Sequence, residues 1–269
     1  MDEATPPTRD GDGAPLAGIR RRIDAIDDEL LRLLIARFEA VDAIRAAKQA
    51  PAGTGIVPVR PAREAVILRR LLAGAGEHLP ARLIVRVWRA IVTEATARQG
   101  PVRVHASAGL HAEEALASGL RDHFCDLEQV CHEDAGAAVA ALAAAPADVA
   151  VVAPDEPWHA ALADAGSRAG VICALPVLAG HGPPPMLVIG RAPNEPTGDD
   201  ETLVASRGGL PREFVPSPLW QVARRDGVVL TSLPGFLAES EVPLVGLKRN
   251  QALAMSVLGR YPSPIVSIS

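Results

Sequence analysis

Aromatic residues and excess positive charge are both scarce in this chain of 269 residues. Phe, Trp and Tyr together make up 3% of the sequence, which argues against modules that stack nucleic-acid bases on exposed rings. The formal net charge of −5 provides no general attraction to phosphate backbones or anionic membranes. We therefore expect no nucleic-acid or membrane partner, and any anionic substrate must be bound by a local cluster of Arg and Lys.

Cysteine is also rare, and long apolar runs are missing. Three cysteines cannot form a disulfide framework, and the odd number fits a reducing compartment. The first residues are acidic and contain proline, unlike a signal peptide, and no run reaches the length of a membrane span. These features predict a cytoplasmic protein. Four residues of types that can bind a metal lie close together in the sequence: His123, Cys125, Cys131 and His132. Their spacing fits no standard zinc pattern, so we expect no metal site there.

The first third of the chain reads as helical. Residues 1–14 are polar and resemble a disordered tail. From there apolar residues recur mostly at steps of three and four, without Gly or Pro between Ile19 and Gln49: Leu16, Ile19, Ile23, Ile26, Leu30, Leu33, Phe38, Val41 and Ile44. Such a helix is roughly 45–50 Å long, too long to bury its seam against two short helices. A second copy of the chain is the natural partner.

Two shorter helices complete this region, which we assign to residues 15–100. Pro61 is at the favoured first position of one, which runs to the break at Gly74. Pro80 begins the other, which ends near Gln99 and has one apolar side: Leu83, Ile84, Val87, Trp88, Ile91 and Val92. The pattern predicts an all-α, three-helix domain.

Beyond Pro101 the pattern changes to short apolar runs that alternate with Ala-rich stretches, which is typical of α/β structure. In residues 101–192 we predict four strands, Val102–His105, Val149–Val152, Val171–Ala174 and Met186–Ile189, and two helices, Glu113–Leu120 and Gly136–Ala145. Residues 193–269 follow a joint rich in Pro, Asn and Gly. Their predicted order is β-α-β-β-α-β, with elements at Thr202–Ser206, Ser217–Arg225, Val228–Leu233, Pro243–Gly246, Lys248–Leu258 and Pro264–Ile268.

Cations on the long helix are the first candidates for a site. Arg37 and Lys48 are eleven positions apart, about three turns, and share one side of the helix. Arg20 lies seventeen positions before Arg37, about 25 Å along the axis, so one helix cannot bring all three to a small ligand. If two long helices run antiparallel in a dimer, Arg20 of one chain approaches Arg37 and Lys48 of the other.

Three residues of the shorter helices complete the constellation. Arg63 and Glu64 open the second helix, and Gln99 closes the third. Spacing alone does not decide their role, because Arg and Lys on helices are usually solvated and Glu64 is also favourable in any first helical turn. The pattern by itself leaves both interpretations open.

The local sequence resembles the all-helical chorismate mutases. The resemblance rests on Leu16–Arg37, on the downstream Lys48, on Arg63-Glu64-x-x-Ile67-Leu68, and on Ile91–Gln99, all in the family's order. It implies an isomerase that rearranges chorismate to prephenate in phenylalanine and tyrosine synthesis, working without cofactor as an intertwined homodimer with shared sites. Arg20 of the partner, Arg37 and Arg63 would bind the carboxylates of chorismate, Glu64 its ring hydroxyl, and Lys48 and Gln99 the ether oxygen. Two positions depart from the pattern: Arg60 replaces a common acidic residue, and Ala95 replaces Ser.

The rest of the chain resembles, more faintly, the dehydratase and ACT-type regulatory parts of bifunctional chorismate mutase–prephenate dehydratases. The similarity is found at Met186–Val204 and Val257–Pro262. The Thr-Arg-Phe element of dehydratases is replaced by His-Gly-Pro-Pro-Pro at residues 181–185, and 101–192 is short for a dehydratase. We therefore expect a structural or regulatory role, with a possible aromatic amino acid effector. The alternatives are a bifunctional enzyme, an isochorismate-pyruvate lyase, and a non-catalytic regulator that binds an aromatic metabolite.

Overall fold

The computed structural model describes residues 13–48, 58–165, 169–179, 182–193, 195–210, 214–224 and 226–266, and it divides the chain into two compact units. The first unit comprises residues 1–51 and the second residues 52–269. Residues 1–12 of the predicted tail lie outside the described part. Within it, no helix is both long and apolar enough to cross a membrane.

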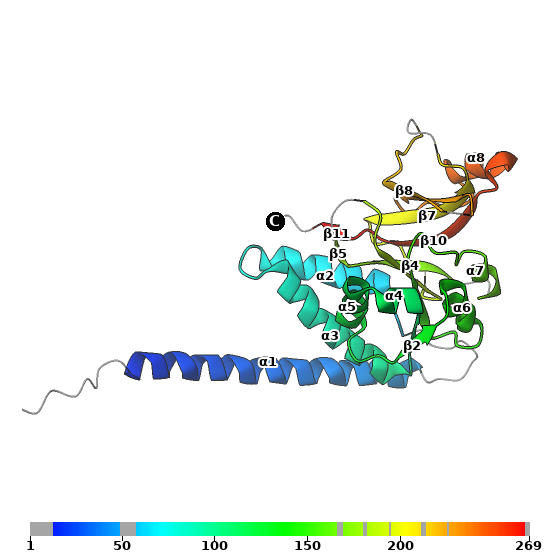
Figure 1. Cartoon of the computed structure of the whole chain (residues 1–269). Helices are drawn as coiled ribbons and strands as arrows, with labels where there is room; N and C mark the ends of the chain where they lie inside the picture. Colours follow the sequence, from blue (N-terminus) through cyan, green and yellow to red (C-terminus); the bar gives the residue numbers. More distant parts are fainter. Residues whose placement is uncertain are drawn as a thin grey trace, which may run out of the picture. The chain divides into compact units, whose positions relative to one another are not determined.

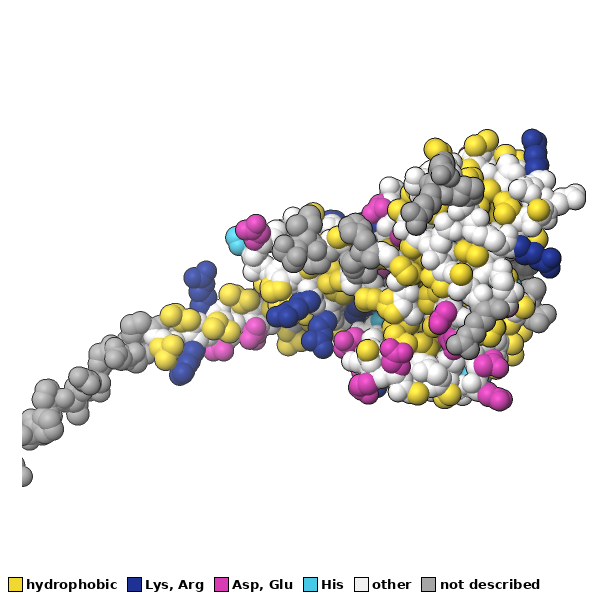
Figure 2. All heavy atoms as spheres, turned by 45° about the horizontal axis from the view of Figure 1, so that its top comes forward, with side chains coloured by type: hydrophobic (Ala, Val, Ile, Leu, Met, Phe, Trp, Pro, Cys, Tyr) yellow, Lys and Arg dark blue, Asp and Glu magenta, His cyan; other side chains and the backbone are white. Residues whose placement is uncertain are grey.

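The first unit consists of one helix, α1 (Gly13–Lys48), which confirms the long helix predicted from the apolar spacing. Most of its large apolar side chains remain between 36% and 58% exposed: Leu16, Ile19, Ile23, Ile26, Leu30, Leu31, Leu33, Leu34, Ile35 and Ile44. Figure 2 shows apolar side chains along this helix, interspersed with charged ones. A single helix has no core of its own, so this apolar surface needs a packing partner.

The second unit begins with the two predicted shorter helices, α2 (Pro61–Ala75) and α3 (Ala81–Gln99). Pro61 lies in the first turn of α2, and Pro80 is the N-cap of α3, as the prolines indicated. The expected buried side of α3 is only partly right. Leu83 and Val87 are 46% and 42% exposed. The buried residues of α3 are two apolar ones, Ile84 and Ala95, and three polar ones, Arg89, Thr93 and Thr96. The reason is that α3 packs its polar side on α5 (Glu114–Phe124), where Arg89 finds partners.

A nine-stranded mixed sheet forms the body of the second unit (Figure 1). Its spatial order is β2-β1-β3-β6-β4-β10-β7-β9-β8. The strands are β1 (Val104–Ser107), β2 (Gln129–His132), β3 (Val149–Val152), β4 (Gly170–Leu175), β6 (Met186–Gly190), β7 (Asp200–Arg207), β8 (Trp220–Ala223), β9 (Val228–Pro234) and β10 (Ser256–Pro262). The α/β character and the four strands predicted within 101–192 are confirmed. A separate parallel pair joins β5 (Leu178–Ala179) to β11 (Ile265–Val266), where a final strand was expected.

Short helices cover both faces of the sheet. On one face α4 (Ala108–Ala112) and α5 pack over the inward side chains of β3 and β6, in a core that includes Leu120, Phe124, Val151 and Met186. On the other face lie α6 (Ala135–Ala140), extended by a 3₁₀ turn at Ala141–Ala143, and α7 (Ala161–Asp164), around Trp158. The alternation along β3 produces this arrangement, because Val149 and Val151 face one layer and Ala150 and Val152 the other.

The predicted helix Ser217–Arg225 is wrong, because this segment contains strand β8. The turn that follows explains the strand. Arg224 and Val228 are joined from backbone N–H to carbonyl at 2.9 Å, and Gly227 has a φ of 78°. Asp226-Gly227 thus closes a hairpin between β8 and β9, with Gly in the left-handed conformation that such a turn requires.

Two neighbouring predictions are also wrong. The expected strand Pro243–Gly246 is the start of α8 (Leu244–Arg249), whose buried Leu244 and Leu247 are three positions apart, as on a helix. The expected helix Lys248–Leu258 ends early in α8, passes through a 3₁₀ turn at Gln251–Leu253, and becomes strand β10. The last segment therefore lacks the predicted β-α-β-β-α-β order.

Glycine 259 explains how β10 joins the two halves of the sheet. It pairs with Val171 of β4, and a Cβ at this position would lie 2.2 Å from the Val171 carbonyl oxygen. Only a residue without a side chain permits this approach. Residues 101–192 and 193–269 consequently contribute to one continuous sheet.

Candidate active site

The cations of α1 lie on a continuous helix. Arg20 is exposed, and Arg37 is partly buried, with its guanidinium carbon 5.9 Å from the centroid of the Phe38 ring. Lys48 ends α1, and its side chain lies outside the described part. With no break between Arg20 and Arg37, the rise along α1 separates them by about 25 Å. One copy of α1 therefore cannot hold a single small ligand with both.

Helix α2 presents Arg63 and Glu64 in different environments. Because Pro61 sets the start of the helix, both residues lie in its first turn, where a carboxylate is favoured by the unpaired backbone N–H groups. Arg63 is exposed, whereas the Glu64 side chain is only 15% exposed. Arg63 is therefore widely accessible, whereas only a small part of the Glu64 side chain reaches the surface.

The partner of Glu64 is Arg89 of α3. The Arg89 Nη1 donates to the Oε2 oxygen of Glu64, and the side chain of Arg89 is 8% exposed. Nε and Nη2 of the same guanidinium donate to the backbone carbonyl of His123, at 3.0 and 2.9 Å. The His123 carbonyl lies in the last turn of α5, where carbonyl groups have no partner within the helix. The buried guanidinium of Arg89 thus donates hydrogen bonds both to the Glu64 carboxylate and to a carbonyl at the C-terminal end of α5.

Two further arginines join α2 to the α/β region. Arg60, which occupies the position of the expected acidic residue, forms an ion pair with Glu195 at 2.6 Å. Arg69 donates to the Thr197 hydroxyl at 2.7 Å and to the backbone carbonyls of Asp199 and Ser263 at 2.8 and 2.9 Å. Helix α2 is consequently linked to the α/β region at its N-cap and near its middle.

Gln99 lies at the C-terminal end of α3 and is partly buried. Its side-chain amide donates to the Ala95 carbonyl one turn earlier, at 3.0 Å. Ala95, which replaces the Ser of the family pattern, is buried. The neighbouring Thr96 is buried as well, so its hydroxyl is not exposed as a substitute for the Ser hydroxyl. An amide has a second N–H, which leaves Gln99 a donor for a ligand.

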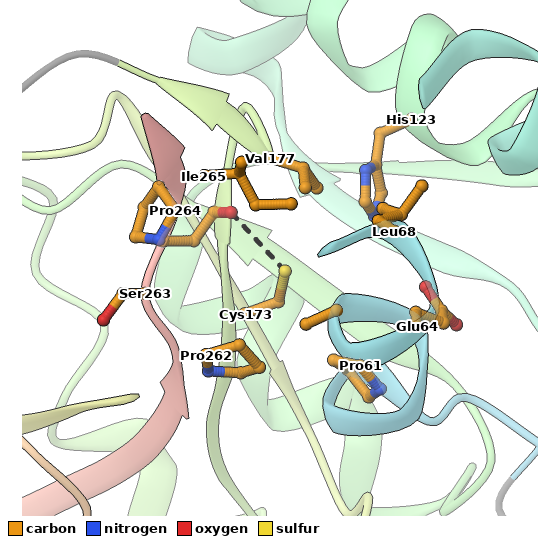
Figure 3. A pocket seen from close by; sticks show the side chains of 12 residues that line it. Pro61, Glu64, Leu68, His123, Cys173, Val177, Pro262, Ser263, Pro264 and Ile265 are labelled. Carbon is orange, nitrogen blue, oxygen red and sulfur yellow. Dashed lines mark hydrogen bonds between the residues drawn. The ribbon is translucent and has the colours of Figure 1, made fainter. Parts of the chain in front are cut away.

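Glu64 also lines two small cavities, each of about 20 Å³. Figure 3 shows the first, where Glu64, His123 and Cys173 lie around a space bordered by the C-terminal segment Pro262–Ile265. Burial, followed by the nearby Glu64 carboxylate, raises the pKa of the Cys173 thiol to about 12, so this group is no nucleophile. Such a cavity holds about one water and is far too small for a ring-bearing dicarboxylate.

The described residues bring no group of three or more His, Cys, Asp or Glu side chains together as metal ligands. Cys125, Cys131 and Cys173 are all free.

Comparison with known proteins places the six candidate residues in one family segment. Residues 19–100 match the chorismate mutase type II family. Over 85 residues the chain is 38% identical to a protein of Neisseria gonorrhoeae named bifunctional chorismate mutase/prephenate dehydratase. That similarity covers 32% of this chain and 22% of the relative, so the matched part spans about a fifth of the relative's length. The chorismate mutase segment contains α2, α3 and all of α1 after Gly18.

A solved structure titled "GqqA- a novel type of quorum quenching acylases" is similar to 60% of this chain and 95% of its own, with a TM-score of 0.35 and 11% sequence identity. At that level of similarity it contributes nothing to the assignment of function.

Within the described residues, no hydrogen bond or ion pair joins any two of the six candidates in the chorismate mutase segment. Arg63 and Glu64 are chain neighbours on α2, whereas Arg20, Arg37 and Lys48 belong to the other unit. Sequence reasoning missed Arg89. A signal for it exists, since Arg89, Thr93 and Thr96 follow one another at helical spacing and form a polar strip among apolar residues.

Proposed function

We propose that the protein is a chorismate mutase, which converts chorismate to prephenate by an intramolecular rearrangement. The observation that supports this best is the match of residues 19–100 to the family, with Arg20, Arg37 and Lys48 on one helix and Arg63, Glu64 and Gln99 on the two helices that follow. Chorismate carries two carboxylates, a ring hydroxyl and an ether oxygen. The six side chains offer a matching set of charges and hydrogen-bonding groups.

The three arginines bind the carboxylates. Planar guanidinium groups suit this task, because they bond a carboxylate through two parallel hydrogen bonds. Arg37 and Arg63 come from the chain that carries Lys48, and Arg20 comes from a second copy. The carboxylate of Glu64 accepts the ring hydroxyl.

A homodimer with shared sites follows from the length of α1. The separation of about 25 Å between Arg20 and Arg37 excludes a joint role within one helix, but two antiparallel copies bring them together. The exposed apolar side chains of α1 supply the surface for such pairing. Val66 of α2 and Leu83 and Val87 of α3 are between 41% and 46% exposed and offer a second apolar surface for it.

The rearrangement needs no nucleophile, metal or cofactor. Its rate comes from holding the compact reactive conformer and from stabilising the negative charge that develops on the ether oxygen. Lys48 donates to this oxygen and Gln99 adds its amide N–H. Lys48 is the principal catalytic residue, because the charge it opposes grows in the transition state.

Residues 101–192 and 193–269, which contribute to one sheet, serve a regulatory or structural role. The segment 181–185 lacks the Thr and Arg of the dehydratase element. The ion pair of Arg60 with Glu195 and the bonds of Arg69 support a structural role, since both link α2 to this region. Dehydratase activity is the second candidate, because the Neisseria relative is named for both activities.

Incubation of the full-length protein with chorismate, with the products separated by chromatography, tests the proposal. Prephenate alone supports a mutase with a non-catalytic remainder. Phenylpyruvate beside it identifies a bifunctional enzyme, and pyruvate with salicylate identifies a lyase. Unchanged chorismate, with a folded protein, rejects the enzyme assignment and favours a regulator that binds an aromatic metabolite.

A further inference from the structure

The buried ion pair between Arg89 and Glu64 links the chorismate mutase segment to the α/β region. Arg89 lies on α3, its carboxylate partner on α2, and its carbonyl partner on α5. The residue is 7% exposed, and three of its guanidinium nitrogens are engaged: Nη1 with Glu64, and Nε and Nη2 with the His123 carbonyl. A cation buried this deeply is retained only when its hydrogen bonds are satisfied.

From these contacts we infer that Arg89 is a positioning residue for Glu64, anchored on the end of α5. This inference rests on the proposed function, in which Glu64 binds the ring hydroxyl of chorismate. Arg89 bonds the Oε2 oxygen of Glu64 and thereby leaves Oε1 for a ligand. The α/β region then contributes to the mutase site indirectly, through one backbone carbonyl and one guanidinium.

The geometry favours Arg over any other residue at this position. A planar guanidinium can direct Nε and Nη2 at one carbonyl while Nη1 points to a carboxylate. The C-terminal end of α5 adds a favourable interaction, because helix C-termini carry partial negative charge. A lysine can keep the charge but has only a single nitrogen, so it cannot serve both partners with the same geometry.

Steady-state kinetics of the full-length protein test the inference, with Arg89→Met and Arg89→Lys compared to wild type. We expect Arg89→Met to raise KM for chorismate roughly tenfold or more with a smaller change in kcat, because a charged hydrogen bond to the bound substrate is misplaced. Arg89→Lys should recover part of this loss. Arg86→Met is the matched control, since Arg86 lies on the same helix in an exposed pair with Asp122 at 3.4 Å.

A double-mutant cycle separates positioning from simple structural support. If Arg89 acts through Glu64, Arg89→Met adds little to the KM of Glu64→Gln. The inference is overturned if the effects of Arg89→Met and Glu64→Gln on KM are additive, or if KM of Arg89→Met equals that of Arg86→Met. The proposed function stands in either case. If wild type and Arg86→Met both leave chorismate unchanged, the proposed function itself fails. Should Arg89→Met not fold, the cycle is run with Arg89→Lys, which retains the buried charge.

Discussion

At the scale of single residues, burial rather than residue type decides which groups are reactive. Cys173 of β4 lines the same small cavity as Glu64, and its thiol donates to the backbone carbonyl of Ala174 at 3.4 Å. Burial raises its pKa to about 12, so almost no thiolate exists at neutral pH. Cys131, on the edge strand β2, is exposed.

This contrast predicts selective alkylation. With iodoacetamide at pH 8 on the folded protein, Cys131 should be labelled well before Cys173, and denaturant should remove the difference. Peptide mass spectrometry after timed quenching measures both sites in one sample. Equal labelling rates in the native protein would contradict the burial of Cys173.

The pKa values of three histidines, His123, His132 and His159, predict how the stability of the protein depends on pH. Burial lowers the pKa of His123 well below its usual value, and Arg89 lowers it further. Burial is also the main cause that lowers the pKa of His132 and of His159. Below the unfolded-state pKa of about 6.5, these histidines bind protons in the unfolded chain but remain mostly neutral in the folded chain. Lowering the pH therefore favours the unfolded chain, and the free energy of unfolding falls.

Denaturant unfolding between pH 7.5 and 5 tests this expectation. The loss below pH 6.5 approaches about 1.4 kcal/mol per pH unit for a histidine that stays neutral in the folded state. His123→Gln should flatten the profile most, because His123 has the strongest shift. A free energy of unfolding that stays constant or rises as the pH is lowered would be inconsistent with the lowered pKa values of these histidines.

At the scale of elements, close contact between β10 and β4 depends on Gly259. A methyl group there would meet backbone atoms of Val171 at 2.2 to 2.8 Å, which cannot move without breaking the strand pairing. Gly259→Ala should therefore destabilise the protein by about 1–3 kcal/mol or more. Gly246→Ala is a matched control, since nothing lies within 4 Å of its added methyl group in α8.

Thermal or denaturant unfolding of both variants gives the comparison. Gly246→Ala should be neutral or slightly stabilising, because Ala is the better helix former. Equal stabilities of the two variants would show that the sheet is not continuous at β4 and β10.

The elements that could be predicted are those with strong local signals. Pro61 and Pro80 mark the starts of α2 and α3, and the apolar spacing alone indicates α1. β8 was missed because its spacing also suits a helix, and its identity depends on pairing with β9 and on the buried bond from the Trp220 indole to Glu201 at 3.2 Å. Such partners lie elsewhere in the chain and are invisible to a local pattern.

The same reasoning applies to the candidate site. Family resemblance predicts site roles for six residues: Arg20, Arg37, Lys48, Arg63, Glu64 and Gln99. It does not predict one for Arg89, and the polar strip formed by Arg89, Thr93 and Thr96 does not by itself show which partners the arginine contacts. Its role became evident only from its contacts with Glu64 and the end of α5. Arg60, which replaces an acidic residue of the family pattern, forms an ion pair with Glu195. This partner is also distant in the sequence and could not be predicted from the local pattern.

At the scale of the whole molecule, shared sites in a dimer predict complementation. Arg20→Ala and Lys48→Ala should each be nearly inactive alone. Mixed after unfolding and joint refolding, they should regain about a quarter of wild-type activity, since half of the random dimers are mixed and each has one intact site of two. Activity that stays at the level of the separate variants would argue that each site is built from a single chain.

Lys48 is the residue on which the proposed rearrangement of chorismate depends most, and the rate of prephenate formation by Lys48→Ala tests this role. Arg32→Ala serves as the control, because Arg32 pairs with Glu29 on the exposed surface of α1. We expect Lys48→Ala to lower kcat by roughly a hundredfold or more with a smaller change in KM, because the Lys48 charge acts in the transition state. The activity of Arg32→Ala should equal that of wild type. A folded Lys48→Ala protein that turns over chorismate at the wild-type rate would show that Lys48 is not the catalytic residue.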